Sequence, residues 1–342
     1  MLARLGKRLR RRAWAPDNGR DGLRTRLLTP AYKVIDGQVD GRPAITLVSA
    51  VGALRATFVP SLAMLGTSLT LGGDELLGQR SGVRAYVDRA KTMGIPLLHP
   101  WANRLQSESF GEPSFVLDQS SPLVHFDDNG LPIHGLHLVD VGWTLTERFA
   151  DEQGARATAT LSVERDDLLS LFPFPHEITV SASLSASTLT LDTHVRSTGE
   201  PPVPIAFGWH PYLQLPRDDR RDWQVGLPVT RRAILDERML PTGVVEVVEP
   251  ETARLGDRTF DDLFTGLRDP PVFTLDGHDT HVEVAFGEGY PCAQVYAPAN
   301  DDVIAFEPMT APTNALVTGI GLPVVAPGAA FTATFSITAV PR

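Results

Sequence analysis

Apolar and polar residues alternate with a period of two along several long stretches of the chain. Residues 157–163, 178–184, 189–195 and 331–339 each place apolar side chains at every second position. This period is typical of strands with one buried and one solvated face, as in antiparallel sheets. Residues 185–187 predict a turn between two of these strands. Amphipathic helical patterns are scarce, although residues 261–267 are compatible with one helical turn.

The composition supports a large β domain. The chain has 342 residues, of which 42% are hydrophobic and 21% charged, which excludes intrinsic disorder, collagen and coiled coil as the dominant state. The 29 glycines and 28 prolines are spread along the chain and favour many short strands joined by turns. We find no internal repeat and no linker after residue 30. We therefore expect an all-β protein in which residues 31–342 form a single antiparallel β-sandwich domain.

Charge is distributed unevenly. Residues 1–26 carry nine basic and two acidic side chains, and the rest of the chain carries a net charge of −17. We expect residues 1–30 to be a disordered basic extension. The acidic body disfavours nucleic-acid binding, and no apolar run approaches the ~18 residues of a membrane span. Cys292 is the only cysteine, so the chain is compatible with a reducing compartment, and we expect it in the cytoplasm.

Two candidate polar sites interrupt apolar runs. Asn103 and Arg104 follow a stretch that we expect to be buried, and a buried guanidinium requires either a structural ion pair or a ligand. Glu307 follows the apolar run 303–306. It is either neutralised in a salt bridge or kept as a base with a raised pKa.

Two histidines are further candidates. His134 precedes a glycine that permits a close backbone approach. His210 is flanked by Trp209 and Tyr212, and such aromatic rings occur in hydrophobic cores as well as where a sugar ring stacks. For both histidines the alternative is a satisfied core residue.

Two histidine pairs have a spacing that metal ligands also use. They are His134 with His137 and His278 with His281. Neither pair is accompanied by a third ligand in a matching context, so we expect no metal site.

Five short motifs follow one another in a fixed order: Asn103-Arg104, Pro132-Ile-His-Gly135, His210-Pro-Tyr-Leu-Gln-Leu215, Asp261-Asp-Leu-Phe264 and Phe306-Glu-Pro-Met-Thr310. Their order and spacing resemble the aldose 1-epimerase (galactose mutarotase) family over roughly residues 35–340. The resemblance implies a galactose mutarotase-like supersandwich, a large antiparallel β-sandwich with a cleft on its concave sheet.

The resemblance also implies roles for individual residues. Glu307 would be the general base and His210 the general acid. The substrate-binding residues would be Arg104, Asn103, His134, Asp261, Trp209 and Tyr212. Asp262 is an alternative to Asp261. Leu136 and Gln214 depart from the family pattern, where a glycine and an asparagine are frequent, and these departures bear on which sugar is preferred.

Mutarotation requires one base to deprotonate the anomeric hydroxyl and one acid to protonate the ring oxygen. The ring opens, the anomeric carbon turns its other face, and the ring closes with the roles reversed. No redox cofactor is required, and the sequence contains no glycine-rich phosphate loop. We expect burial to raise the pKa of Glu307 and a neighbouring carboxylate, Asp261, to keep His210 protonated.

Two alternative functions remain open. A hexose-6-phosphate 1-epimerase on the same fold requires an additional cationic pocket, and with only three lysines in the chain arginines would have to supply it. A noncatalytic carbohydrate-binding protein requires neither an acid nor a base, so the presence of both Glu307 and His210 argues against it. The oligomeric state does not follow from the sequence.

Overall fold

The computed structural model describes residues 32–107, 109–110 and 115–342. The basic extension expected over residues 1–30 lies outside the described residues. The strands and helices have the following bounds: β1 Lys33–Val39, β2 Arg42–Val48, β3 Leu54–Val59, η1 Pro60–Leu62, β4 Leu65–Leu71, β5 Asp74–Glu75, α1 Gly82–Arg89, β6 Leu97–Leu98, β7 Ser109–Phe110, β8 Phe115–Val116, β9 Val124–Phe126, β10 Pro132–Leu136, β11 Thr144–Ala150, β12 Ala155–Val163, α2 Asp166–Leu169, β13 His176–Ser185, β14 Thr188–Ser197, β15 Val203–Pro204, β16 Gly208–Trp209, β17 Tyr212–Leu213, η2 Arg220–Asp222, β18 Gln224–Leu227, β19 Val229–Leu235, β20 Pro241–Val247, β21 Glu251–Arg254, β22 Phe260–Leu267, β23 Val272–Asp276, β24 Thr280–Phe286, β25 Cys292–Ala297, β26 Ile304–Met309, α3 Ala315–Thr318, β27 Val324–Val325 and β28 Ala330–Pro341.

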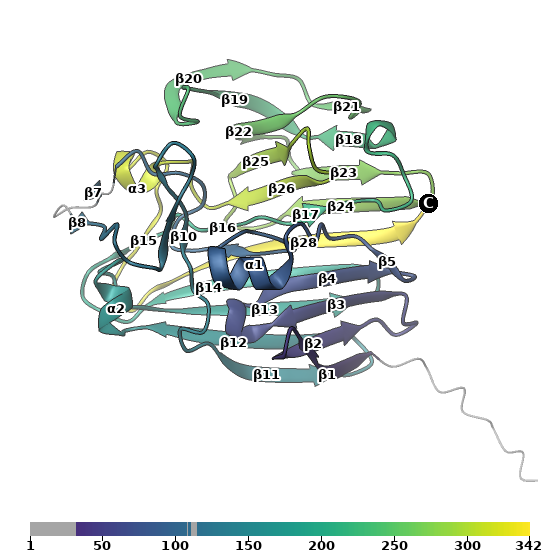
Figure 1. The fold of residues 1–342 in the computed structure, drawn as a ribbon, viewed down its shortest axis with the longest axis horizontal. Helices are drawn as coiled ribbons and strands as arrows, with labels where there is room; N and C mark the ends of the chain where they lie inside the picture. Colours follow the sequence, from purple (N-terminus) through teal and green to yellow (C-terminus); the bar gives the residue numbers. More distant parts are fainter. Residues whose placement is uncertain (1–31, 108, 111–114) are drawn as a thin grey trace, which may run out of the picture.

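Three large antiparallel sheets build most of the fold, and three further pairs of short strands accompany them in the described residues (Figure 1). A nine-stranded sheet has the order β11-β12-β13-β14-β28-β24-β23-β18-β21, and an eight-stranded sheet has the order β20-β19-β22-β25-β26-β16-β6, with β17 also paired to β26. The five-stranded sheet β1–β5 lies against β11 and β12 of the nine-stranded sheet. The expected all-β antiparallel architecture is confirmed.

The four alternating stretches of the sequence lie side by side in the nine-stranded sheet. They form β12, β13, β14 and β28, which are consecutive neighbours in that sheet. The expected helical turn at residues 261–267 is wrong: these residues belong to β22, which pairs with β19 and β25. The ladders on both sides satisfy its backbone and fix the extended conformation.

The hydrophobic core lies between the sheets. Phe306 of β26 stacks on Phe273 of β23 with ring centroids 5.1 Å apart, and Trp209 packs against Phe335 of β28 at 6.0 Å. One cluster of buried apolar residues extends from Ile45 to Ala339. Since side chains alternate along a strand, the neighbours of Phe306 in β26 point to the opposite face of the eight-stranded sheet.

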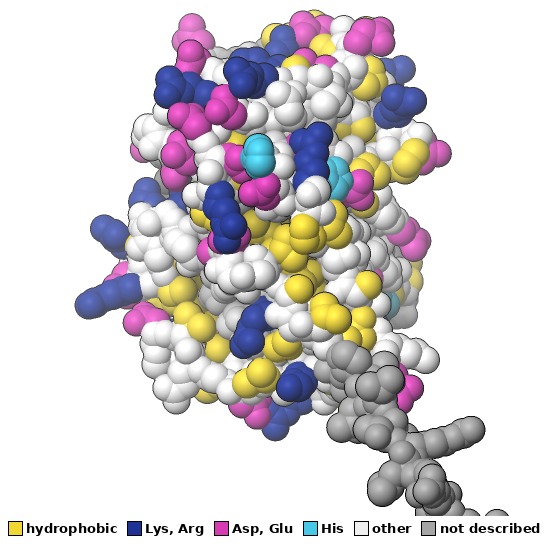
Figure 2. All heavy atoms as spheres, turned by 90° about the vertical axis from the view of Figure 1, so that its right-hand side faces the viewer, with side chains coloured by type: hydrophobic (Ala, Val, Ile, Leu, Met, Phe, Trp, Pro, Cys, Tyr) yellow, Lys and Arg dark blue, Asp and Glu magenta, His cyan; other side chains and the backbone are white. Residues whose placement is uncertain are grey.

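On the face shown in Figure 2, basic and acidic side chains are interspersed and do not gather into a patch of one sign. Within the described part of the chain, no helix has the length and apolar character needed to cross a bilayer.

Candidate active site

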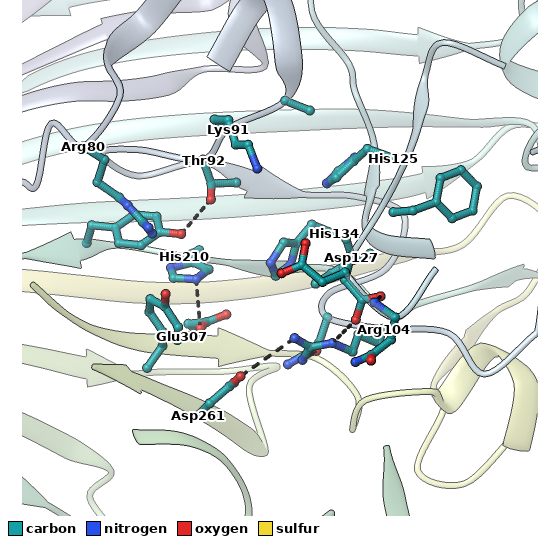
Figure 3. Close-up of a pocket in the computed structure, with 18 of the residues that line it drawn as sticks. Arg80, Lys91, Thr92, Arg104, His125, Asp127, His134, His210, Asp261 and Glu307 are labelled. Carbon is teal, nitrogen blue, oxygen red and sulfur yellow. Dashed lines mark hydrogen bonds and ion pairs between the residues drawn. The ribbon is translucent and has the colours of Figure 1, made fainter. Parts of the chain in front are cut away.

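A cavity of about 390 Å³ opens over the outward face of the eight-stranded sheet (Figure 3). Its floor is formed by strand residues, and its walls come from the segments around α1, β6, β9 and β10. The lining residues are mostly polar: Arg80, Ser81, Ala90, Lys91, Thr92, Asn103, Arg104, His125, Phe126, Asp127, Asp128, Asn129, Ile133, His134, His210, Tyr212, Asp261, Tyr296 and Glu307.

The floor of the cavity holds a carboxyl–imidazole pair. His210 Nε2 lies 3.2 Å from Glu307 Oε1, and the two residues are only 3% and 1% exposed. Glu307 points into the cavity because it follows the core residue Phe306 in β26. Within the described residues, Glu307 Oε2 and His210 Nδ1 have no hydrogen-bond partner. Both atoms are therefore unsatisfied polar groups at the floor of the cavity.

Burial determines the protonation of this pair. Burial raises the pKa of Glu307 well above its usual value; the negative charge of Asp261 adds to the shift and Arg104 opposes it. Burial, with a contribution from the charge of Arg80, lowers the pKa of His210 to about 3. Both shifts favour the state in which the pair's shared proton lies on Glu307 and both groups are neutral. The expectation that Asp261 keeps His210 protonated is therefore wrong: burial lowers the pKa of His210, and the carboxyl group beside it is that of Glu307.

Arg104 is fixed by three polar contacts on one side of the cavity. Its Nε donates to Asp127 Oδ2 at 2.7 Å, Nη1 donates to Asn103 Oδ1 at 3.0 Å, and Nη2 lies 3.8 Å from Asp261 Oδ2. Burial opposes ionisation of Asp127, but hydrogen bonds from the Leu131 amide and Arg104 lower the pKa of its carboxyl group. Arg104 thus presents a rigid set of donors to a polar ligand.

The structure distinguishes Asp261 from Asp262. Asp261 lines the cavity and accepts a hydrogen bond from Gln294 Nε2 at 2.6 Å, and burial raises the pKa of its carboxyl group. Asp262 pairs with Arg232 at 3.4 Å and does not line the cavity. Alternation along β22 accounts for the difference.

Backbone strain positions Asn103 and His134. Both have left-handed conformations, with φ of 59° and 62°, and the His134 amide donates to the Asn103 carbonyl at 2.9 Å. Gly135 follows with φ of 76°, and a Cβ there would lie 2.3 Å from the His99 carbonyl oxygen. The position therefore requires glycine. His134 reaches His210 edge-on with ring centroids 5.6 Å apart.

The aromatic residues on either side of His210 occupy different places. Tyr212 lines the cavity and stacks on the His210 imidazole, with centroids 4.0 Å apart and planes inclined by 18°. Trp209 was expected to bind substrate, but it is fully buried in the core and its Nε1 donates to Thr193 Oγ1 at 3.0 Å. The one-residue offset from His210 turns Trp209 to the inner face of the sheet.

Several lining residues were missed by the sequence analysis. The sequence pattern could have predicted Tyr296, because Gln294 and Tyr296 are polar side chains at alternate positions of a buried strand. They pair in register with Glu307 and Asp261, respectively. Other lining residues that were not predicted come from segments with no distinctive local pattern, among them Arg80, Lys91, Thr92, His125 and Asp127.

The histidine pairs considered for metal binding make other contacts. His137 Nε2 lies 3.0 Å from the Val87 carbonyl, and His281 bonds to Asp276 and Glu283. Among the residues with described positions, no group of three or more histidine, cysteine, aspartate or glutamate side chains is arranged to hold a metal ion.

The chain belongs to the aldose 1-epimerase family, whose sequence model matches residues 67–338. No curated protein sequence matches the chain. Three solved structures illustrate the similarity of the fold. A galactose mutarotase-like protein from Clostridium acetobutylicum has a TM-score of 0.79 at 15% identity, covering 91% of this chain and 99% of the other. A galactose 1-epimerase from Lactobacillus acidophilus has a TM-score of 0.73 at 16% identity, with coverages of 91% and 98%. A protein from Synechocystis sp. PCC 6803 has a TM-score of 0.69 at 22% identity, with coverages of 91% and 96%.

Proposed function

We propose that this protein is an aldose 1-epimerase that interconverts the α and β anomers of a free hexose by general acid–base catalysis. The observation that carries the proposal is the buried pair of Glu307 and His210 at the floor of a polar cavity. Two titratable groups that share one proton are what reversible ring opening requires. Membership of the aldose 1-epimerase family supports the same reaction class.

In the proposed mechanism, Glu307 acts as the base and His210 as the acid. Transfer of the shared proton across their 3.2 Å contact produces a carboxylate and an imidazolium side by side. The carboxylate removes the proton of the anomeric hydroxyl while the imidazolium protonates the ring oxygen. After the anomeric carbon has turned its other face, the reverse transfers close the ring and restore the pair. Each group typically contributes ~10²–10⁴ in rate.

The remaining polar residues bind the sugar hydroxyls in this proposal. Arg104 and Asn103 offer donors on one wall, and Asp261 offers an acceptor held by Gln294. Tyr296 lies across from Asp261 in the paired strand. Such convergent donors and acceptors orient the anomeric carbon toward the acid–base pair.

The charges of the lining favour a neutral hexose over a hexose 6-phosphate. Arg104 is already paired with Asp127, and Arg80 is paired with Asp301 at 3.2 Å. Lys91 is exposed and makes no ion pair within the described residues, so it is the cation that remains for a phosphate. One exposed lysine is a weak site for a dianion compared with a bidentate arginine cluster.

Polarimetry tests the proposal. Freshly dissolved α-glucose and α-galactose should lose their excess rotation faster in proportion to protein concentration, above the buffer rate. Acceleration confined to a hexose 6-phosphate would favour the phosphate alternative. Saturable sugar binding without any acceleration would identify a noncatalytic binding protein.

A further inference from the structure

The segment that precedes α1 places Arg80 against the aromatic wall of the cavity. Its guanidinium carbon lies 4.6 Å from the ring centre of Tyr212 and 5.8 Å from that of Tyr296, and its Nε lies 3.2 Å from Asp301 Oδ2. Arg80 also has a left-handed backbone, with φ of 44°. Strain of this kind persists only where the surroundings fix the residue, and it concentrates at functional sites. The position of this charge is therefore determined by both the backbone and the ion pair.

Tyr212 connects this charge to the acid–base pair. Its hydroxyl shares a hydrogen bond of 2.6 Å with Thr92 Oγ1, and its ring stacks on the His210 imidazole at 4.0 Å. The backbone of Tyr212 also accepts from the Gly78 amide at 2.9 Å and donates to the Gly94 carbonyl at 2.8 Å. These two bonds anchor both ends of the segment that carries Arg80. Asp301, Arg80, Tyr212 and His210 thus form one continuous chain of contacts.

We propose that Arg80 is a positioning residue for the epimerase reaction. Through Tyr212 it holds the His210 imidazole against Glu307, and its charge, balanced in part by Asp301, sets the upper pH at which the pair keeps its shared proton. The inference rests on the function proposed above and adds a residue to that site.

The surroundings of His210 explain why Arg80 has this influence. Besides Glu307 and the stacked Tyr212, His134 and Tyr296 approach its ring edge-on at 5.6 and 5.7 Å. Burial raises the pKa of the Tyr212 phenol and lowers the pKa of the His134 imidazole well below its usual value, so neither group carries a charge at neutral pH. Arg104 and Asp261 act on the Glu307 side with opposite signs. The other titratable groups lining the cavity are Lys91, His125, Asp127 and Asp128.

The sign of the effect follows from charge. A cation near the pair disfavours its protonated form, so Arg80 lowers the pH at which the shared proton is lost. Removing the charge of Arg80 should raise that pH. Removing the charge of Asp301 should lower it, because the field of Arg80 is then less compensated. The two substitutions at this ion pair should therefore shift the pH at which the shared proton is lost in opposite directions.

The test measures kcat and KM against pH by polarimetry for the wild-type protein, Arg80→Gln, Arg80→Lys and Asp301→Asn, with circular dichroism to confirm folding. The alkaline limb is the part of the pH profile in which kcat/KM falls as the pH rises. For Arg80→Gln we expect this limb to move to higher pH by about 0.5–1 pH unit. We expect kcat at the optimum to fall about tenfold, because the imidazole is held less firmly. Arg80→Lys should keep the limb in place, and Asp301→Asn should move it down.

Three outcomes would overturn the inference. An unchanged limb with a raised KM in Arg80→Gln would make Arg80 a sugar ligand only. Limbs that move in the same direction in Arg80→Gln and Asp301→Asn would indicate general loosening of the site. Arg80→Lys keeps the positive charge, so an alkaline limb that shifts in this variant would exclude the charge of Arg80 as the cause of the shift in Arg80→Gln. Absence of mutarotation in the wild-type protein would refute the proposed function, and this is measured before any variant.

Discussion

A buried pair of histidines packs beside the backbone of the cavity residue His134. Replacement of one of them, His176, gives a quantitative test of the structure. His99 Nε2 and His176 Nε2 are 2.8 Å apart, and His176 Nδ1 donates to the Phe174 carbonyl at 2.6 Å. Because Nδ1 of His176 carries the proton, its Nε2 accepts from His99. A further proton on His176 would set two N–H groups against each other in the core. The His99 carbonyl in turn accepts from Leu136 and abuts Gly135, next to His134.

The pKa of His176 gives the size of the effect. Burial lowers this pKa from 6.5 to about 4. Between these two pH values the unfolded chain binds a proton at this position and the folded protein does not, so stability falls as pH falls through the window. Each pH unit costs up to ~1.4 kcal/mol, which amounts to about 2 kcal/mol between pH 6.5 and pH 5.

Urea unfolding at pH 7 and pH 5 measures this cost in the wild-type protein and in His176→Gln. The variant should be less stable at pH 7 by about 1–3 kcal/mol, because hydrogen bonds in the core are lost. Its further loss on going to pH 5 should be smaller than that of the wild type by about 2 kcal/mol. Replacement of the exposed His278 by glutamine is the matched control and should keep the wild-type dependence. An equal loss in the wild type and in His176→Gln would refute the reasoning.

Two further substitutions distinguish a residue that binds the sugar from a residue that only packs in the core. Arg104→Gln removes the guanidinium that Asp127 holds. In saturation kinetics this variant should raise KM at least ~10-fold with a smaller change in kcat. A normal KM would exclude Arg104 from sugar binding. Trp209→Phe removes the hydrogen bond to Thr193 and part of the core packing, and it should lower the free energy of unfolding by about 1–3 kcal/mol while leaving KM unchanged. A raised KM in the folded Trp209→Phe protein would place that indole in the sugar site.

The sequence was informative where a local pattern determines the structure. Alternation predicted β12, β13, β14 and β28, because each of these strands buries one face. The five motifs contain four residues that were predicted to lie in the site, and the structure places all four around one cavity: Glu307, His210, Arg104 and Asp261.

The errors and omissions have physical causes. Residues 261–267 have apolar spacings that also suit a helix, and only pairing with β19 and β25 makes them extended. Trp209 is adjacent to His210 in sequence, yet a strand sends neighbouring side chains to opposite faces. Arg80 reaches the site through hydrogen bonds between its segment and Tyr212, which is more than a hundred residues away in sequence. No local pattern encodes such a long-range contact.

The central claim is that Glu307 and His210 act as one acid–base unit on the sugar. The most direct measurement is the mutarotation rate of Glu307→Gln, His210→Asn and the double variant, with Asp262→Asn as a carboxyl-to-amide control outside the cavity. Each single variant should lose at least ~10²-fold in kcat, and the double variant should lose little more, because the two groups serve the same proton transfers. Asp262→Asn should remain close to the wild type. Near-normal turnover in a folded Glu307→Gln or His210→Asn protein would contradict the account.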